Sequence, residues 1–418
     1  MMKEVWKSDE VSGGMLEGMR VEFLEEVCEK HGVAKFGPNE EDLIYSIQKH
    51  KKPFEFVIGT REHVVPGPVV KPWPRIEVLV GEPFKAEYMK GRAMARIGDK
   101  LQWFPYGGDP SKRRHKVDTM SVRLGDGTFE QTPWEDAGYV GDLVCRDGEQ
   151  VVFPGWGDDY LVIKEGEIHK VRCRVNRVRG GAQHANGLVY SLSYSSSQFN
   201  RKKLQRLDVK ELVWSEVEVE RSYSAGLSFV TVWGAVSALG HVFFIPAHTD
   251  RIEFVHRDHP DKLRVLPGKV RGGFKDHGNP RYTHGVFHEK SGKIVVPGRS
   301  ARGVLLIDPV ELSFEEVAMP EELVQAMPTG SFTFDCAIGP DGLVYPAPWA
   351  DPERMYRFDP VSREFDWIDT TEILGPLRGK KDGEWRRGGN GYCTTAHRIG
   401  NEIYFGCGGV RKPLKLVF

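Results

Sequence analysis

Side chains that can bind a polar ligand recur in the turn-rich segments between short apolar runs of this chain. Aromatic rings offer stacking surfaces, while arginine, histidine and aspartate supply charge and directional hydrogen bonds. The candidate binding residues share this placement and are Tyr106, Trp156, His248, Arg299, Arg302, Trp349, Asp351 and Arg386. If these segments converge on one face, they would line a polar bowl for a glycan or another small molecule. The alternative is that they form an ordinary solvated rim.

Two further side chains could act as an acid and a base. His284 and Asp335 carry the groups that most often transfer protons in enzymes, so they are the catalytic candidates if the protein is an enzyme. The sequence contains no G-x-S-x-G, no H-E-x-x-H and no Walker phosphate-binding loop. No standard catalytic motif therefore supports this alternative.

Three histidines are candidates for a metal site. His184, His284 and His397 fall in or beside predicted inner strands, and three imidazoles around a channel could bind Zn²⁺ or Mn²⁺. No two of these three are two or four residues apart, so we predict no metal site and no cofactor. His256 and His259 have a helical ligand spacing but lie in a predicted loop, where we expect both to be solvated.

The elements that would position these residues are short β-strands. The segment 281–319 breaks into four apolar runs separated by Gly, Pro, Asp and Ser turn signals. Four consecutive antiparallel strands of this length make up one blade of a β-propeller. A single blade cannot bury both of its faces, so the pattern must recur along the chain.

A glycine turn followed by an apolar run does recur, at intervals of 39 to 58 residues. The copies begin at Gly98, Gly148, Gly187, Gly240, Gly292, Gly342 and Gly400. We therefore predict an all-β fold, a seven-bladed β-propeller of four-stranded antiparallel blades. The blades are placed at residues 88–134, 137–176, 179–222, 228–270, 281–319, 331–373 and 390–418.

The N-terminal region has a different pattern. Residues 1–13 carry no clear element signal and are expected to be frayed. Apolar side chains at helical spacing predict one helix over residues 15–30 and a second that begins after Asn39. Residues 1–50 are thus predicted to form a small α-helical arm. This arm either packs on the flank of the propeller or docks to a protein partner or larger assembly through residues 15–50.

The chain between the arm and the blades is predicted to be a connector that leads into a closing strand. Residues 51–74 are rich in proline and should be extended. Residues 75–81 resemble the fourth strands of later blades, whereas the last blade has only three strands of its own. We predict that residues 75–81 pair with Lys412–Phe418 and close the ring, so that the propeller spans residues 75–418.

Two apolar runs that end in a pair of glycines carry a family resemblance. Leu101–Gly108 and Ile403–Gly409 resemble the corresponding strands of kelch repeats, although the middle blades end in Pro-Gly or Pro-Ala. The resemblance to kelch-like propellers covers about residues 88–418 and is one of architecture. It implies a binding platform, because kelch-like propellers mostly bind partners.

Composition narrows the function classes further. The net charge is −1, which disfavours nucleic acid and acidic membranes as partners. There is no apolar run of membrane length, no secretion signal and no C-x-x-C pair among the six cysteines. We expect a soluble protein with free thiols, either cytoplasmic or assembled in a particle.

Two functions remain open from the sequence. The first is a non-catalytic binding or structural protein with an N-terminal docking arm, for example a component of a virus particle. The alternative is a propeller enzyme, a lyase or hydrolase, that acts on a carbohydrate or small metabolite in the central bowl.

Overall fold

The computed structural model divides the chain into two compact units, residues 1–73 and residues 74–418. The structure describes residues 4–7, 28, 55–58, 72–79, 91–105, 117–134, 139–144, 148–154, 159–173, 178–193, 202–219, 232–271, 281–325, 333–348, 354–374, 393–407 and 412–418. Each unit is described by itself below.

The N-terminal unit contains a two-stranded antiparallel sheet. β1 (Glu4–Lys7) pairs with β2 (Glu55–Ile58), with Glu4 opposite Ile58. The expectation that residues 1–13 are frayed is therefore wrong for β1, which finds its partner far along the chain. Cys28 is helical and fully buried, while the rest of the two predicted helices lies outside the described residues.

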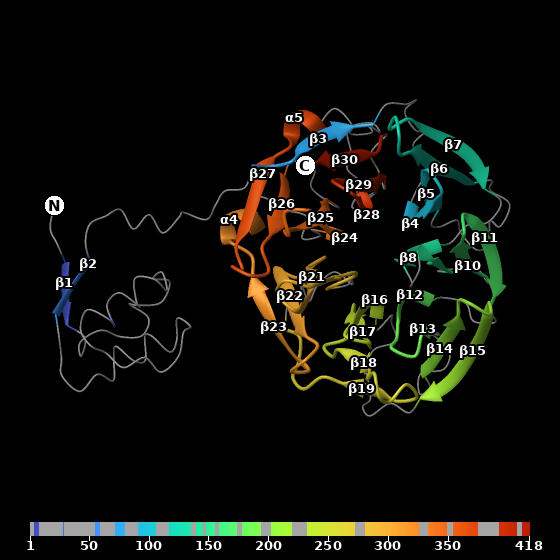
Figure 1. The fold of residues 1–418 in the computed structure, drawn as a ribbon, viewed down its shortest axis with the longest axis horizontal. Coiled ribbons are helices and arrows are strands. Elements are labelled where there is room, and N and C mark those ends of the chain that lie inside the picture. The colour runs from blue at the N-terminus through green and yellow to red at the C-terminus, as the bar shows by residue number, and fades with distance from the viewer. Residues whose placement is uncertain are drawn as a thin grey trace. The chain divides into compact units, whose positions relative to one another are not determined.

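The second unit is a ring of seven four-stranded antiparallel sheets, which confirms the predicted fold class (Figure 1). In each sheet the first strand lies innermost in the ring and the fourth lies at its rim (Figure 1). The first three blades are β4 (Gly91–Ile97), β5 (Lys100–Pro105), β6 (Val117–Arg123), β7 (Phe129–Trp134); β8 (Tyr139–Val144), β9 (Gln150–Pro154), β10 (Asp159–Lys164), β11 (Glu167–Arg172); and β12 (Val178–Gln183), β13 (Val189–Ser193), β14 (Lys202–Asp208), β15 (Val213–Val219).

The remaining four blades follow in chain order. They are β16 (Val232–Ala238), β17 (His241–Pro246), β18 (Glu253–Val255), β19 (Leu263–Val265); β20 (Val286–His288), β21 (Lys293–Pro297), β22 (Gly303–Asp308), β23 (Ser313–Ala318); β24 (Thr333–Ile338), β25 (Val344–Pro348), β26 (Arg354–Phe358), β27 (Phe365–Asp369); and β28 (Cys393–Ile399), β29 (Glu402–Cys407), β30 (Leu414–Val417) with β3 (Arg75–Val78). Two short helices, α4 (Glu321–Gln325) and α5 (Thr371–Leu374), follow the fifth and sixth blades.

The glycines that marked the blades have a common backbone conformation. All have a positive φ: 59° at Gly98, 82° at Gly148, 87° at Gly187, 84° at Gly240, 66° at Gly292, 82° at Gly342 and 58° at Gly400. This left-handed region costs other residues energy because their Cβ approaches the backbone. The turn between the first two strands of each blade therefore selects glycine. This is why a glycine recurs once per blade in the sequence.

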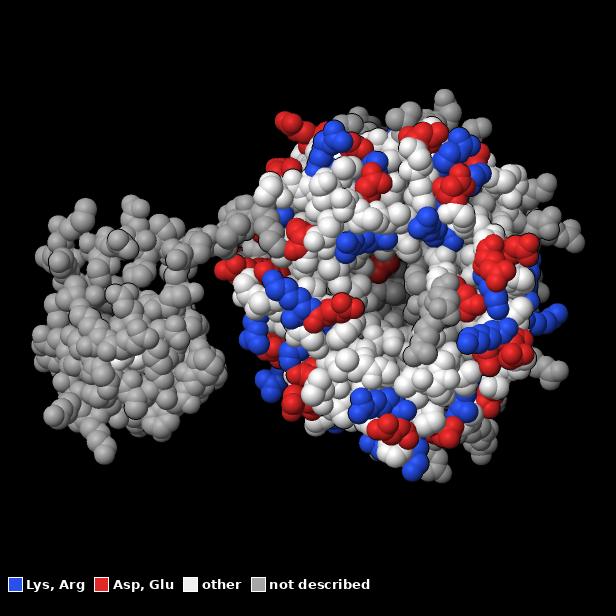
Figure 2. Space-filling view, in the orientation of Figure 1, with Lys and Arg blue, Asp and Glu red and all other residues white. Residues whose placement is uncertain are grey.

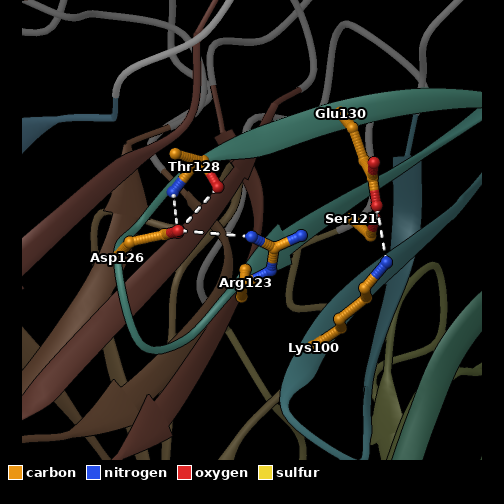
Figure 3. Close-up of polar contacts among 6 residues, drawn as sticks. All are labelled: Lys100, Ser121, Arg123, Asp126, Thr128 and Glu130. Atoms are coloured by element: carbon orange, nitrogen blue, oxygen red, sulfur yellow. Dashed lines mark hydrogen bonds and ion pairs between the residues drawn. The ribbon is translucent and has the colours of Figure 1, made fainter.

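Acidic side chains stabilise the turns between third and fourth strands. In the first blade Asp126 accepts hydrogen bonds from the backbone N–H of Thr128 at 2.9 Å and from its hydroxyl at 2.6 Å (Figure 3). These bonds lower the pKa of Asp126. Beside this turn, Glu130 accepts from Lys100 at 2.6 Å and from Ser121 at 3.3 Å (Figure 3). Asp208, Asp308 and Asp359 cap the equivalent turns of later blades through backbone amides.

The seventh blade is completed by the strand that precedes the first blade. β3 pairs antiparallel with β30, Arg75 opposite Val417 and Val78 opposite Leu414. The Leu79 N–H donates to the Pro413 carbonyl at 3.0 Å, which extends the ladder. On the paired strand β30, Leu414 and Leu416 are buried. The predicted pairing between the two ends of the ring is thus present.

Neighbouring blades hold one another through apolar faces. Between the fifth and sixth blades, Val295 and Leu306 pack with Val344 and Phe358 in one buried cluster. Between the fourth and fifth, Phe243 and Phe254 belong to a second cluster that continues into β21 and β22. Because each blade buries a face on each side, the first and last blades must meet, which makes the closing strand a structural requirement.

Candidate ligand-binding site between the fourth and fifth blades

An extra residue is inserted near the beginning of every innermost strand. In six blades the pairing of the first two strands shifts by one residue. In the fifth, Tyr282 pairs with Gly298 and Val286 with Val295, which again leaves one residue more on the first strand. Such bulges bend a strand and redirect its side chains. The inserted segments contain Trp233, His284 and Asp335.

The inner strands surround a hollow at the centre of the ring (Figures 1 and 2). Because the bulges recur in all blades on strands of equivalent position, they place irregular backbone around this hollow. Irregular backbone at a ring axis is where propellers and other scaffolds position ligand-binding groups.

Trp233 organises the best-defined part of this region. The guanidinium carbon of Arg299 lies 5.2 Å from the centre of the Trp233 ring, a cation–π contact. The His248 ring approaches the same indole from the side, with centroids 6.4 Å apart and planes inclined by 55°. Trp233 and Arg299 are buried, whereas His248 is half-buried. Tryptophan thus joins a cation of the fifth blade to an imidazole of the fourth.

The backbone of Arg281 holds the two contributing loops together. Its N–H donates to the Ala247 carbonyl at 2.8 Å, beside His248. Its own carbonyl accepts from the N–H of Arg299 at 2.8 Å and from that of Ser300 at 3.2 Å. The backbone of one residue therefore fixes the loop after β17 relative to the loop after β21, and the site is positioned by backbone hydrogen bonds.

The loop that carries Arg299 folds back on itself at a glycine. The Gly298 N–H donates to the Gly303 carbonyl at 2.9 Å. A Cβ at Gly298 would lie 2.3 Å from the Ala301 carbonyl oxygen, so only glycine fits. This tight turn holds Arg299 inward and leaves Arg302 exposed. Since residues 298–303 contain two arginines and no acid, the loop presents positive charge.

His284 lies next to this cluster, on the other side of β16. A Cβ at Gly234 would come within 2.4 Å of the Thr283 carbonyl oxygen and 3.2 Å of the His284 ring. The glycine after Trp233 therefore lets the fifth blade approach the fourth closely. Sequence reasoning missed Trp233, although the Trp-Gly pair in an inner strand was the available signal.

Both carboxylate oxygens of Asp335 accept hydrogen bonds from backbone amides. One of its carboxylate oxygens accepts from the N–H of Cys336 at 2.8 Å, and the other accepts from the N–H of Ala396 in the seventh blade at 3.2 Å. The carboxylate therefore joins β24 to β28. Burial, followed by the nearby Asp335 carboxylate, raises the pKa of the Cys336 thiol well above its ordinary value, so this cysteine is protonated at neutral pH.

The structure brings together only some of the candidates chosen from the sequence. His248 and Arg299 meet around Trp233, and Arg302 lies three residues beyond Arg299 with its carbonyl accepting from the Met319 N–H at 3.0 Å. The other binding candidates lie outside the described residues and remain predictions: Tyr106, Trp156, Trp349, Asp351 and Arg386. His284 precedes β20 of the fifth blade, and Asp335 lies in β24 of the sixth.

Metal and membrane features are absent from the described part of the chain. Within the ranges given above, no group of three or more His, Cys, Asp or Glu side chains could hold a metal ion. His284 precedes β20 whereas His184 follows β12, so these histidines occupy different ends of their strands. Among the same residues, none of the helices has the length and apolarity needed to span a bilayer.

Comparison with known proteins identifies an architecture. No protein-family model matches the chain, and no curated protein is significantly similar to it in sequence. Membership in the kelch family is therefore not shown. Solved structures do match. A catalytically inactive virginiamycin B lyase from Staphylococcus aureus with quinupristin is 11% identical, covers 82% of this chain and 99% of its own, with a TM-score of 0.56.

Two other solved structures span the same part of the chain. A streptogramin B lyase is 10% identical over 82% of this chain and 97% of its own, with a TM-score of 0.55. YCF48 bound to D1 peptide is 12% identical over 82% of this chain and 100% of its own, with a TM-score of 0.50. At these identities the likeness shows the fold alone, and the chain is a seven-bladed β-propeller.

Proposed function

We propose that this protein is a binding platform that takes a peptide or glycan on the loops of the fourth and fifth blades. The observation that carries the proposal is the Trp233–Arg299 contact, with His248 at its edge. Buried aromatic and arginine side chains fixed by a backbone framework are the anchors that protein interfaces use most. The half-buried His248 and the exposed Arg302 supply the groups that a ligand would touch.

The charge of this loop favours an acidic or polar ligand. The Arg281 guanidinium donates to the Val270 carbonyl at 2.8 Å, and Arg302 in the loop after β21 is exposed. Asp250, the acidic residue of the neighbouring loop, is paired with Lys269 at 3.3 Å. Arginine guanidinium groups bind carboxylates and other anionic groups through charge-assisted hydrogen bonds.

Peptide and glycan arrays test the proposal directly. We expect the wild-type protein to bind a defined subset of features, and the double variant His248→Ala with Arg302→Glu to lose at least about tenfold in apparent affinity, which is about 1.4 kcal/mol. Lys210→Glu is the matched control, since Lys210 is an exposed residue in the β14–β15 turn of another blade. Array binding that survives the double variant, or is lost equally in the control, would contradict the proposal.

The runner-up function is a lyase or hydrolase that uses His284 with Asp335. Two of the proteins with similar folds are lyases, and one of these structures is a catalytically inactive variant with quinupristin. Against this function, the two carboxylate oxygens of Asp335 accept backbone amides and link β24 to β28, which is a structural role. Incubation with quinupristin, followed by mass spectrometry, separates the two. We expect no turnover, and turnover that His284→Ala abolishes would establish the enzyme instead.

The N-terminal arm keeps its proposed role as a docking module. Residues 15–50 lie outside the described residues apart from Cys28, and neither the fold nor the comparisons support a component of a virus particle. The docking proposal therefore extends only to a protein partner or a second copy of the chain.

A further inference from the structure

Four histidines gather between the third and fourth blades, at the end of β16 that is remote from Trp233. His241 begins β17, His184 follows β12, and His256 and His259 lie in the β18–β19 connection. The rings of His241 and His256 have centroids 4.5 Å apart, and those of His256 and His259 are 5.6 Å apart. His184 is 2% exposed and His241 is 5% exposed. The expectation of a solvated pair is therefore wrong for His256, which is packed on His241, and holds for the exposed His259.

Backbone amides determine the protonation state of three of these rings. Each Nδ1 accepts from a main-chain N–H: His184 from Asn186 at 3.2 Å, His241 from Arg257 at 3.1 Å and His256 from Asp258 at 3.2 Å. An Nδ1 that accepts a hydrogen bond carries no proton, so each of these imidazoles is neutral with its proton on Nε2. Protonation of Nδ1 would place the ring N–H opposite the main-chain N–H, so that two donors would face each other.

A hydrogen bond from His184 bridges the two blades. His184 Nε2 donates to the His256 carbonyl at 3.1 Å, and the Ala185 N–H donates to the Gly240 carbonyl at 3.0 Å. The approach is close, because a Cβ at Gly240 would lie 2.9 Å from that of Ala185. His288 makes the equivalent bond from the fifth blade to the Gly342 carbonyl at 2.8 Å. At the third–fourth interface, the residue that accepts the His184 bond belongs to a group of three further histidines, His241, His256 and His259.

Charged groups of both signs surround the cluster, and most of them are exposed. Arg257 and Arg264 face the rings as cations, and Asp258 lies 3.6 Å from His256 Nδ1. From the third blade, Arg206 pairs with Asp261 across the interface. Asp258 has 65% of its side chain exposed, so water screens its charge. The Asp258 carboxylate raises the pKa of His241, but the lowering by burial is larger.

We propose that this cluster, defined by His184, His241, His256 and His259, is an acid-sensitive latch that holds the third and fourth blades together at neutral pH and releases them when His241 and His256 are protonated.

The direction of the pH dependence follows from linkage. Burial, with smaller contributions from His256 and Arg257, lowers the pKa of His241 to about 4, and burial also lowers the pKa of His256. In the unfolded chain both histidines titrate near about 6.5. Between these values the unfolded or opened chain binds protons that the closed latch does not, so stability is present above about pH 6.5 and declines as the pH falls towards 4. Each such histidine lowers the folding equilibrium constant by up to about tenfold per pH unit.

Urea unfolding of the full chain between pH 7.5 and pH 4.5 tests the latch. The His241→Asn variant keeps an acceptor at the Nδ1 position and cannot titrate, so its unfolding midpoint should fall less steeply with pH than that of the wild type. His169→Asn is the control, because His169 lies half-buried on β11 of the second blade, and this variant should keep the wild-type slope. Equal slopes in wild type and His241→Asn would overturn the proposal.

A second measurement avoids any variant that folds poorly. Nuclear magnetic resonance of the histidine rings in the wild-type chain reports the tautomer and the titration midpoint of each ring. We expect the Nε2–H tautomer for His184, His241 and His256 at pH 7, with a midpoint for His241 below about 5. A midpoint near about 6.5, or an Nδ1–H tautomer, would show that the cluster is an ordinary packed surface. Amide exchange in β12 and β17 that accelerates on acidification, beyond the intrinsic change, locates the release at this interface.

Discussion

Deletion of residues 75–81 is expected to abolish cooperative folding of the propeller. The segment buries apolar side chains of its own, since Leu79 is 4% exposed and Ile76 and Val78 are half-buried, and the loss of each costs about 1–2 kcal/mol. The lost ladder bonds of four paired residues add about 1 kcal/mol each. Together these losses approach the whole net stability of a typical domain, about 5–15 kcal/mol. The freed edge of β30 would also pair with other chains, so we expect aggregation.

Removal of residues 1–71 is the matched control for this deletion. The boundary between the two compact units follows Trp73, so this truncation takes away the N-terminal unit and keeps β3. We expect an intact circular-dichroism spectrum, a single cooperative transition and a monomeric elution volume. A propeller that survives the loss of residues 75–81 but not the loss of residues 1–71 would reverse the assignment of the closing element.

Gly406→Ala is expected to destabilise the interface between the last and first blades by about 3 kcal/mol, the upper part of the range for overpacking a core. A Cβ at Gly406 would lie 1.9 Å from Trp103 Nε1 and 2.2 Å from Thr395 Oγ1. Trp103 is 1% exposed and Thr395 is 2% exposed, so neither side chain has space to withdraw. The seventh and first blades would have to separate.

Gly125→Ala is the control for that substitution. Gly125 has no atom within 4 Å of its Cβ position and no positive φ, so alanine should be neutral or stabilise by about 0.4–1 kcal/mol. Thermal unfolding of both variants gives the comparison. In the Gly406→Ala background, Trp103→Phe should recover part of the loss because it removes the colliding Nε1. Equal stability of Gly406→Ala and Gly125→Ala would show that the blades are not in close contact here.

The architecture was predictable because its signals are local. A turn that requires a positive φ selects glycine at Gly98 and at each later copy, and the apolar strands that follow are continuous in the sequence. The closing strand was predictable by the same means, since β3 has the pattern of a fourth strand and the C-terminus has none. Neither inference needed the contacts of any single side chain.

The site was only partly predictable because it depends on pairing between segments. The bulge at Trp233 arises from a one-residue shift against β17, and nothing in the sequence of β16 alone indicates which residue is inserted. Arg299 was recognised as a loop arginine, but its contact with Trp233 depends on the Arg281 backbone. For Asp335, the amide donor from Ala396 comes from another blade, so its structural role could not be distinguished from a catalytic one.

The ring depends on the pairing of β3 with β30 in one register. Disulfide formation between these two strands measures the register most directly. Arg75 is opposite Val417, and paired Cα atoms about 5.5 Å apart suit a disulfide. We predict that Arg75→Cys with Val417→Cys forms an intramolecular disulfide under mild oxidation and raises the unfolding midpoint. Arg75→Cys with Lys412→Cys, five residues or about 16 Å along the strand, should remain reduced. Efficient cross-linking of the second pair, or only intermolecular products from the first, would contradict the closed ring.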